Sequence, residues 1–519
     1  MEWKPKHNPW LIALTVTLAT FMEVLDTSIA NVSLPHIAGN LSAGVDESTW
    51  VLTSYLVANA IILPLSAWFS SLMGRKNYYM LSVAVFTVSS FLSGLAPTLG
   101  WLVVFRILQG LGGGGLQPSE QSILADTFPK EKLGMAMALY GFAVVTAPII
   151  GPTLGGWITD NFSWRWIFFI NIPVGFLSIY LTSRMVEDPP TMHRRELKGL
   201  HIDYIGISAV ALGIAALQIM LDKGERDDWF SSHFILALGV IALVAITFAV
   251  VWEIYQKDPI IDFRMLGERN FGIANILMFM LGVILFGSTV LLPLFLQTLM
   301  GYTATLAGLV LSPGGLVTML TMPLVGFLLG KFQPKWLIVY GLCVVSFSLF
   351  QMSHFNLLID YKTALFARMI QAAGIGFLFI PINTVAYSFV SHEKHNQASG
   401  LINLARNLGG SVGIAYVTTM LSRYAQEHQN YLAAHMTATS PAYQSALHGM
   451  TRALIFRGVD PYQTLPLARG TLYGRLLRQA SMLAYADVFR LMSFACLCTF
   501  FLVLLLKPTA PRKDAIAVH

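Results

Sequence analysis

The most informative part of this chain is "GFAVVTAPIIGPTLGGW", residues 141–157. It is mostly apolar, but Pro148 and Pro152 each remove a backbone hydrogen bond and bend a helix. Gly151 and Gly155 are four residues apart, a spacing at which small residues let a partner helix approach closely. We therefore predict a bent helix with a close packing face. Its residues of interest are Gly141, Pro148, Gly151, Pro152, Gly155 and Gly156.

The composition places this helix in a membrane. Of the 519 residues, 55% are hydrophobic and 12% are charged, and the mean hydropathy is +0.63. Soluble domains carry about 25% charged residues. Apolar runs of about 20 residues, each long enough to cross a bilayer, recur along the chain, whereas the alternating segments of a membrane β-barrel do not. The predicted fold class is therefore an all-α polytopic membrane protein.

Apolar windows predict fourteen transmembrane helices. They cover residues 10–34, 49–70, 78–97, 100–124, 134–158, 166–186, 203–221, 232–253, 271–298, 305–330, 336–354, 363–390, 399–421 and 488–506. An even number of crossings puts both ends of the chain on the same side of the membrane.

The distribution of Lys and Arg predicts which side this is. With the N-terminus inside, the inner segments contain nineteen Lys and Arg residues, and the short outer loops contain four. Basic residues of short loops are enriched on the cytoplasmic side, so we expect the inner (cytoplasmic) membrane with both termini in the cytoplasm. The same distribution accounts for the net charge of +6, and no nucleic-acid partner is expected.

An internal repeat divides the chain. "RILQGLGGGG", residues 106–115, and "RMIQAAGIGF", residues 368–377, share Arg, Gln, Gly and Gly at matching positions, each in the fourth helix of a set of six. Parallel repeats of this kind relate two halves by an axis along the membrane normal. We predict an N-terminal bundle in residues 1–188, an inserted helix pair in 189–256 and a C-terminal bundle in 257–519, with a long periplasmic loop at about 422–482.

Two carboxylates interrupt the first predicted helix in "FMEVLDTSIAN", residues 21–31. A charged residue in a membrane helix costs about 2.5–3.5 kcal/mol, so Glu23 and Asp26 require a partner or a function. They are three residues apart and share a helical face, which we expect to line a cavity between the two halves. Burial disfavours the ionised form of a carboxyl group, so each is a candidate to take up and release a proton.

Arg106, in the fourth helix, is the expected partner of Asp26. Two alternatives remain open. The first is that the Asp26–Arg106 pair is a structural clamp that never titrates. The second is that Glu23 contacts a cationic substrate instead of exchanging a proton.

Other polar residues of the predicted helices are candidates to line the same cavity: Asn31, Asn59, Gln109, Arg368, Asn383 and Arg406. The alternative for each is a hydrogen bond between helices. Arg368 is the repeat counterpart of Arg106, but the ninth predicted helix has no acidic residue to match Asp26. The coupling chemistry is therefore expected in the first half.

Residues 141–157 resemble the antiporter motif in the fifth helix of drug exporters of the major facilitator superfamily. "LDTSIANVSLP" (25–35), "FRILQGLGGGG" (105–115) and "WRWIFFINIPVG" (164–175) are similar to that family's motifs in its first, fourth and sixth helices, in the same order. With fourteen predicted helices, the chain resembles the drug:proton antiporters of the EmrB/QacA type, and EmrB-like exporters in particular, over almost its full length. The resemblance implies the major facilitator fold, with two six-helix bundles plus two inserted helices. It also implies that Asp26 and Arg106 take part in proton coupling.

"AWFSSLMGRK", residues 67–76, departs from the family's pattern between helices 2 and 3. Gly74, Arg75 and Lys76 match the pattern, but Ser71 stands at its acidic position. The resemblance implies that this loop holds the outward-facing state together through charge contacts. Without the carboxylate, either that contact is lost or its acidic partner lies elsewhere, and the alternative is a plain basic turn with a glycine.

The resemblance implies a proton-coupled exporter of drugs or other amphiphilic small molecules, with the proton as coupling ion and no metal or other cofactor. It implies a periplasmic adaptor and an outer-membrane channel as partners, which the 422–482 loop would help to dock. A lid or an amphipathic helix on the outer leaflet are the alternatives for this loop. The chain has no G-x-x-x-x-G-K-[ST], HExxH or GxSxG motif, so neither an ATP-driven pump nor an enzyme is expected.

Three other functions remain open. They are the export of one secreted metabolite or siderophore, the proton-coupled import of a solute, and a sensor function without transport.

Overall fold

The structure of the chain is a computed structural model that describes residues 5–129, 132–188, 203–257, 259–388, 390, 394–437 and 439–507. In these residues the regular structure is helical throughout, so the predicted all-α fold is confirmed. The predicted boundary after residue 188 adjoins residues 189–202, which lie outside the described part of the chain.

The helices follow the predicted spans. Those that correspond to them are α1 (Pro9–Asn40), α3 (Trp50–Met73), α4 (Arg75–Leu95), α5 (Leu99–Gly113) with α6 (Leu116–Thr127), α7 (Leu133–Asn161), α8 (Trp166–Phe169) with α9 (Asn171–Met185), α10 (Tyr204–Lys223), α11 (His233–Tyr255), α12 (Arg269–Thr298), α13 (Ala304–Leu328), α14 (Pro334–Met352), α15 (Tyr361–Ser388), α16 (His395–Ala434) and α18 (Pro461–Cys498) with α19 (Phe500–Leu504). The others are α2 (Val45–Ser48), α17 (Pro441–Phe456) and the short helices η1 (Trp229–Ser231) and η2 (Phe263–Gly267).

Within the described residues, twelve helices are long and apolar enough to cross a membrane, and the bent α7 makes thirteen. The remaining predicted span, 399–421, corresponds to α16. This helix is not among the thirteen, and it carries Asn403, Arg406 and Asn407 in its middle. It nevertheless packs inside the bundle against α3, α6, α12 and α18. The multi-pass helical architecture is therefore confirmed, while the number fourteen stays a prediction.

The fourth predicted span is two helices, α5 and α6, separated within a run of glycines. A Cβ at Gly112 would lie 2.6 Å from the Phe86 nitrogen of α4, and one at Gly114 would lie 2.6 Å from the Asn59 carbonyl of α3. Side chains at these positions would push the helices apart. The glycine run thus brings the backbones of three helices together at this point.

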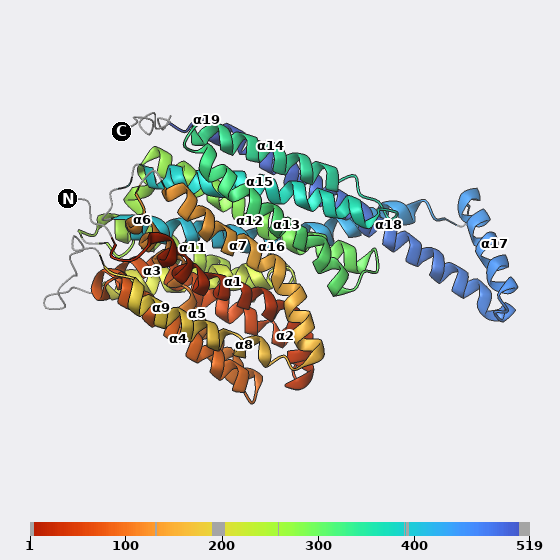
Figure 1. The fold of residues 1–519 in the computed structure, drawn as a ribbon. Helices are drawn as coiled ribbons and strands as arrows, with labels where there is room; N and C mark the ends of the chain where they lie inside the picture. Colours follow the sequence, from red (N-terminus) through yellow and green to blue (C-terminus); the bar gives the residue numbers. More distant parts are fainter. Residues whose placement is uncertain are drawn as a thin grey trace.

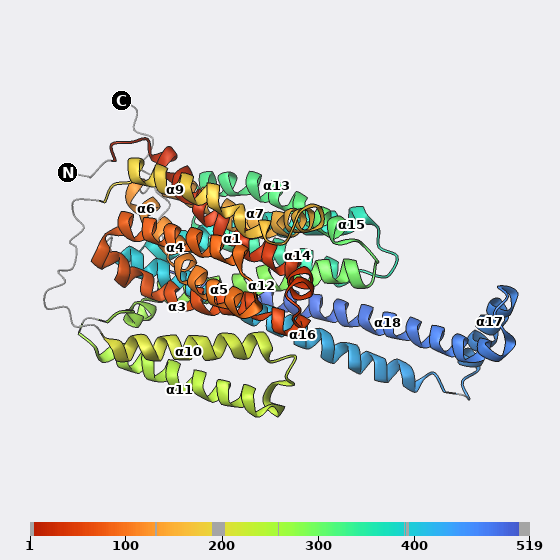
Figure 2. The same ribbon diagram turned by 90° about the horizontal axis from the view of Figure 1, so that it is seen from below.

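Figure 1 shows the long helices running side by side, with the start of α1 and the end of α19 at the same end of the bundle. Helices α1 to α9 pack mainly on one another, as do α12 to α16 with α18 and α19. We call these sets the N-terminal group and the C-terminal group. They meet where α13 and α15 pack on α7 and where α16 packs on α3 and α6. Helices α10 and α11 pack on each other along the outside of the bundle, and α10 contacts α3 and α16 (Figure 2).

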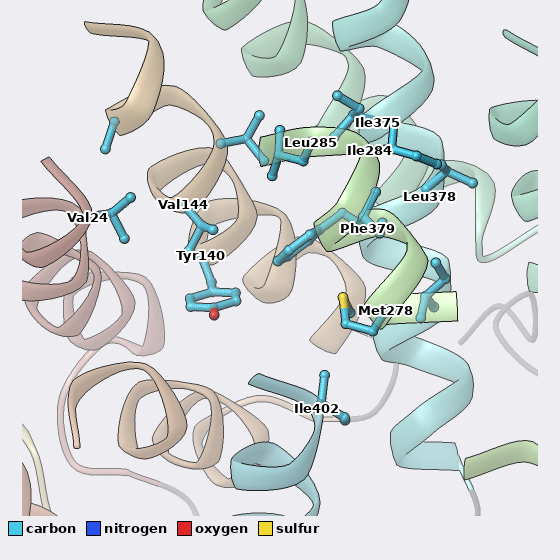
Figure 3. Close-up of a cluster of buried hydrophobic side chains, with 14 of the residues drawn as sticks. Val24, Tyr140, Val144, Met278, Ile284, Leu285, Ile375, Leu378, Phe379 and Ile402 are labelled. Carbon is cyan, nitrogen blue, oxygen red and sulfur yellow. The ribbon is translucent and has the colours of Figure 1, made fainter. Parts of the chain in front are cut away.

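Apolar side chains of both groups meet in the centre of the bundle (Figure 3). Val144 and Tyr140 of α7 are buried there, together with Leu285 of α12 and Phe379 of α15. The rings of Tyr140 and Phe379 are 5.8 Å apart between centroids. Lipid tails are as apolar as these side chains, so close packing contributes more than the hydrophobic effect to holding the groups together.

The predicted loop at 422–482 is largely helical. Helix α16 continues to Ala434, α17 follows, and α18 begins at Pro461, so both flanking helices extend well past their predicted spans. Figures 1 and 2 show α17 and the adjoining ends of α16 and α18 projecting from the bundle, at the end opposite to the start of α1. We call the described part of residues 422–482 the projecting hairpin.

Candidate functional site

Asp26 and Arg106 form an ion pair in the interior of the N-terminal group. Arg106 Nη1 donates to Asp26 Oδ2 at 2.5 Å, and the two side chains are 0% and 1% exposed, respectively. The other carboxyl oxygen, Oδ1, accepts from Gln109 Nε2 at 3.1 Å and from Asn171 Nδ2 at 2.7 Å. Donors from α5 and α9 thus converge on one carboxyl group. They satisfy its hydrogen bonds, which matters because a buried acceptor without a partner is destabilising.

Arg106 is fixed in place by further contacts. Its Nε donates to the Val51 carbonyl at 3.0 Å, and Nη1 also donates to Gln109 Oε1 at 2.7 Å. The guanidinium carbon lies 4.2 Å from the centre of the Tyr55 ring, close enough for a cation–π contact. Removing one partner of such a buried pair costs about 3–5 kcal/mol, because it leaves the other charge uncompensated.

Glu23 lies one turn before Asp26 on α1 and has different partners. Its Oε1 accepts from Tyr55 Oη at 2.9 Å and from Asn59 Nδ2 at 3.1 Å, and Oε2 accepts from Gln117 Nε2 at 2.7 Å. The residue is 3% exposed. Glu23 is therefore buried among neutral donors from α3 and α6, whereas Asp26 is buried against a cation.

Gln117 of α6 connects Glu23 to the C-terminal group. Its Oε1 accepts from Arg406 Nη2 and, at 3.2 Å, from Tyr140 Oη. Arg406 Nη1 also donates to Tyr140 Oη at 3.0 Å. A continuous set of hydrogen bonds thus runs from α1 through α6 to α16.

Further bonds between the groups lie one turn along α6, at Gln121. Its Oε1 accepts from Asn403 Nδ2 and from Tyr387 Oη, both at 2.9 Å, and also from Ser399 Oγ. Helix α6 is therefore the element of the N-terminal group that meets the polar side chains of α15 and α16.

The expectation that Glu23 and Asp26 face one cavity between the halves does not hold for Asp26. Its side-chain partners come from α5 and α9, inside the N-terminal group, and only Glu23 is connected to the C-terminal group through Gln117. A step of three residues rotates an α-helix by about 300°, which leaves the two side chains about 60° apart. That angle is enough to give them different neighbours.

Arg368 occupies in the C-terminal group the position that Arg106 occupies in the N-terminal group. It likewise donates to the glutamine three residues later, Gln371. Where Arg106 meets a carboxylate, Arg368 meets two hydroxyls of α12, Ser288 Oγ at 3.3 Å and Thr289 Oγ1 at 3.2 Å. The two repeats thus place their arginines alike but surround them with different chemistry.

The remaining polar candidates are in three situations. Asn59 donates to the Glu23 carboxyl group, and Gln109 donates to the Asp26 carboxyl group. Asn383 is buried and donates to the Phe379 carbonyl of its own helix at 2.8 Å. Asn31 is exposed, so the structure does not place it with the buried polar residues.

Gly151 and Gly155 of α7 lie against α1. A Cβ at Gly151 would overlap the Ser28 side chain, and one at Gly155 would lie 2.9 Å from Ile29 Cγ2 and 3.1 Å from Ile29 Cα. The small residues thus permit the close approach that their spacing indicates.

The other two glycines of this stretch have different surroundings. A Cβ at Gly141 would lie 2.9 Å from Phe379 Cδ1, so Gly141 packs against the C-terminal group. A Cβ at Gly156 would have nothing within 4 Å, so Gly156 is not part of the packing face.

The prolines of α7 leave a backbone carbonyl free, and α1 supplies its hydrogen bond. The helix bends by 45° between Leu133–Pro148 and Ile150–Asn161. Pro152 has no N–H to donate to the Pro148 carbonyl four residues earlier. Ser28 Oγ donates to that carbonyl at 3.1 Å instead, so α1 supplies a hydrogen bond that α7 lacks.

The connection between α3 and α4 is the single residue Gly74, whose φ of 86° favours glycine. Arg75 and Lys76 therefore begin α4 rather than lie in a loop. Arg75 pairs with Asp126 of α6, and the Lys76 backbone nitrogen donates to Asp188 Oδ1 at 2.9 Å. Arg75 thus has an acidic partner on α6.

Sequence reasoning missed the residues that connect the predicted ones. Tyr55, Gln117 and Asn171 are uncharged, and nothing in the sequence separates them from other polar residues of membrane helices. Glu120 is different, because it is a carboxylate inside the predicted span 100–124. The cost of a charge in a membrane, which identified the carboxylates of α1, would have identified it too.

Comparison with known proteins matches residues 16–414 to the model of the Major Facilitator Superfamily. The fatty acid resistance protein FarB of Neisseria gonorrhoeae is 36% identical over 510 residues, which cover 98% of each chain. The multidrug export protein EmrB of Escherichia coli (strain K12) is 36% identical over 455 residues, 86% of this chain and 88% of EmrB. The solved structure of the proton:xylose symporter XylE has a TM-score of 0.59 at 16% identity and covers 94% of each chain, a likeness of fold alone.

Proposed function

Because the chain belongs to the Major Facilitator Superfamily of membrane transporters, we propose that it exports drugs and other amphiphilic small molecules in exchange for protons. Two relatives of 36% identity are named a multidrug export protein and a fatty acid resistance protein, which supports amphiphiles as the substrate class. The transporter lies in the inner membrane with both termini in the cytoplasm. It works by alternating access between an N-terminal bundle (1–188) and a C-terminal bundle (257–519), with residues 189–256 as an inserted pair.

One observation carries the proton-coupling part of this proposal: Glu23 is hydrogen-bonded to Gln117, which is hydrogen-bonded to Arg406 of the other group. When the two groups separate at this point, Arg406 leaves Gln117 and the surroundings of Glu23 change. Coupling requires a ligand to bind two states of the protein with different affinity. Glu23 meets this requirement for the proton, because its surroundings depend on how the N-terminal group and the C-terminal group are arranged.

The apolar centre of the bundle supports an amphiphilic substrate. Side chains such as Val144, Leu285 and Phe379 face one another between the groups (Figure 3). Small-molecule sites are mostly apolar with a few polar groups. Opening of this interface would expose an apolar wall bordered by Arg406 and Tyr140, which suits a hydrophobic molecule with a polar end.

Transport into inside-out membrane vesicles tests the proposal, with a labelled long-chain fatty acid as the probe. One proton moved through about 100 mV supplies about 2.3 kcal/mol, enough for about a 50-fold concentration ratio. We expect the probe to accumulate when the lumen is acidic and not when the pH is equal on both sides. Accumulation only when the lumen is alkaline, and above that in vesicles without the protein, would indicate a proton-coupled importer. Flux that ignores the pH gradient would contradict proton coupling.

The projecting hairpin is the proposed docking site for a periplasmic adaptor, which in turn meets an outer-membrane channel. Phe456 and Tyr462 at its far end are 94% and 93% exposed. Aromatic residues are enriched in the cores of protein interfaces, so these two side chains are suited to a partner protein. Replacing both with serine is expected to leave transport into vesicles intact and to reduce efflux from whole cells. Equal whole-cell efflux in the variant and the unaltered protein would contradict adaptor docking at this place.

A further inference from the structure

Glu120 of α6 is a buried carboxylate that the coupling site described above does not use. It is 0% exposed, and Thr17 Oγ1 of α1 donates to its Oε1 at 2.6 Å. Its second oxygen, Oε2, has no hydrogen-bond partner among the described residues. Thr20, one turn along α1, contributes another buried hydroxyl beside the Glu120 carboxyl group.

This arrangement is costly for a residue with a purely structural role. A glutamine at position 120 would accept the hydrogen bond from Thr17 equally well and would carry no charge. A buried carboxylate without a basic partner costs several kcal/mol when ionised. The carboxyl group is therefore better explained by its ability to bind a proton than by the contact with Thr17.

The position of Glu120 relates it to Glu23. Thr17, Thr20 and Glu23 follow at intervals of three residues, so each side chain is turned about 60° around α1 from the one before it, and Glu120 contacts the first of them. Thr17 is six residues from Glu23, about 9 Å along the helix axis. The direction from Glu23 to Glu120 leads toward the end of the bundle where α1 begins (Figure 1).

Among the titratable groups on the helices around Glu120, Glu23 is the one that can exchange a proton with it. The titratable groups facing Glu120 are Glu23 of α1, Tyr79 of α4 and Tyr140 of α7. Tyr79 donates to the Val16 carbonyl at 2.7 Å, and Tyr140 donates to acceptors on α6 and α16.

The basic groups of the surrounding helices have other partners. Arg406 of α16 reaches α6 at Gln117, and Arg75 of α4 is paired with Asp126. Neither of these contacts neutralises Glu120 directly, so its charge depends on whether it holds a proton.

We propose that Glu120 is a second proton-binding site, which receives a proton from Glu23 and releases it toward the end of the bundle where α1 begins. The inference rests on the proposed proton-coupled export. In the transfer, the O–H bond of protonated Glu23 breaks and an O–H bond to Glu120 Oε2 forms. Glu23 is left as a carboxylate with its three hydrogen-bond donors, and the hydrogen bond from Thr17 to Oε1 is retained.

Infrared difference spectroscopy on the purified full-length protein tests proton binding without any substrate. The carbonyl-stretch band of protonated carboxyl groups is followed as the pH is raised, in the unaltered protein and in Glu120→Gln. We expect one titrating component of this band to be absent from Glu120→Gln and present, at a shifted pH, in Glu120→Asp. Identical titrations of Glu120→Gln and the unaltered protein would overturn the proposal.

The vesicle assay tests the transfer step. We expect Glu120→Gln to reduce pH-driven accumulation of the labelled fatty acid by about 100-fold, within the range for loss of a positioned acid–base group. Its equilibrium binding of the same probe is expected to be unchanged. Glu47→Gln, a matched change at an exposed residue, is expected to retain full transport. Normal pH-driven transport by Glu120→Gln would refute the relay role.

The two proposals fail in different ways. Absence of pH-driven transport in the unaltered protein would overturn the proposed function, whereas the infrared titration still decides whether Glu120 binds a proton.

Discussion

At the scale of single residues, two carboxyl groups one turn apart on α1 are stabilised by different chemistry. Asp26 is paired with the cationic side chain of Arg106 inside the N-terminal group. Glu23 has neutral donors, and its link to Arg406 runs through one amide, that of Gln117. The contacts of Asp26 therefore depend on the arrangement of helices within the N-terminal group, whereas those of Glu23 depend also on the distance between the N-terminal and C-terminal groups.

Asp26→Asn is expected to abolish pH-driven export while retaining substrate binding, because asparagine cannot carry the exchanged proton. It also leaves Arg106 without an anionic partner, at a cost of about 3–5 kcal/mol, so thermal stability in detergent is measured alongside vesicle transport. Thr27→Val at the neighbouring position is the control, since Thr27 Oγ1 donates within its own helix, to the Val24 carbonyl. If Asp26→Asn pumps against a gradient at the normal rate, Asp26 is not a coupling residue.

At the scale of elements, the contact between α1 and α7 depends on glycines and a proline of α7 and on a serine of α1. Glycines remove side-chain volume from α7, a proline removes a backbone donor, and Ser28 of α1 satisfies the carbonyl left free at Pro148. Residues 141–157 thus combine a packing face with a bend whose free carbonyl is satisfied by α1.

Gly155→Ala and Gly156→Ala form a matched pair that tests this packing. The added methyl group at 155 would be too close to Ile29, so we expect a loss of stability of about 1–3 kcal/mol from overpacking. The methyl group at 156 meets open space, so this change is expected to be neutral or to stabilise the helix by up to about 1 kcal/mol. Thermal unfolding in detergent measures both. Equal effects of the two substitutions would show that the α1–α7 contact is not tight at Gly155.

At the scale of the whole molecule, polar contacts hold the two groups together toward the end where α1 begins. Asn396 Nδ2 of α16 donates to Ser70 Oγ of α3 at 3.1 Å, and Ser399 donates to the Pro118 carbonyl at 3.2 Å. Ser70 is near the end of α3 and Asn396 is near the start of α16. The proposed alternating access requires these contacts to break in each cycle.

Cross-linking tests this requirement in a background with Cys343, Cys496 and Cys498 replaced by alanine. A short bifunctional thiol reagent is expected to stop vesicle transport when Ser70 and Asn396 are both changed to cysteine, because the groups are then joined where they must separate. The same reagent on cysteines at Gln429 and Tyr473, which contact each other within the projecting hairpin, is expected to leave transport intact. Undiminished transport by the cross-linked 70/396 protein would contradict a rocking motion at this end.

The sequence by itself determined the class of the protein, the positions of most helices and the presence of the charged residues Asp26, Glu23 and Arg106 inside them. These features are local, because apolar runs of about 20 residues and charges placed inside them can be recognised without knowing what lies next to them. The repeat of Arg106 at Arg368 is local as well, since it needs only two short segments to be compared.

Only the tertiary structure decided which face of each helix meets which neighbour. It separated Asp26 from the interface between the groups, connected Glu23 to Arg406 through Gln117, and brought the overlooked Glu120 against Thr17. The physical reason is that helices buried in lipid are apolar on every side, so periodicity does not fix their rotation. Their rotation is set by packing and hydrogen bonds between helices that are distant in sequence.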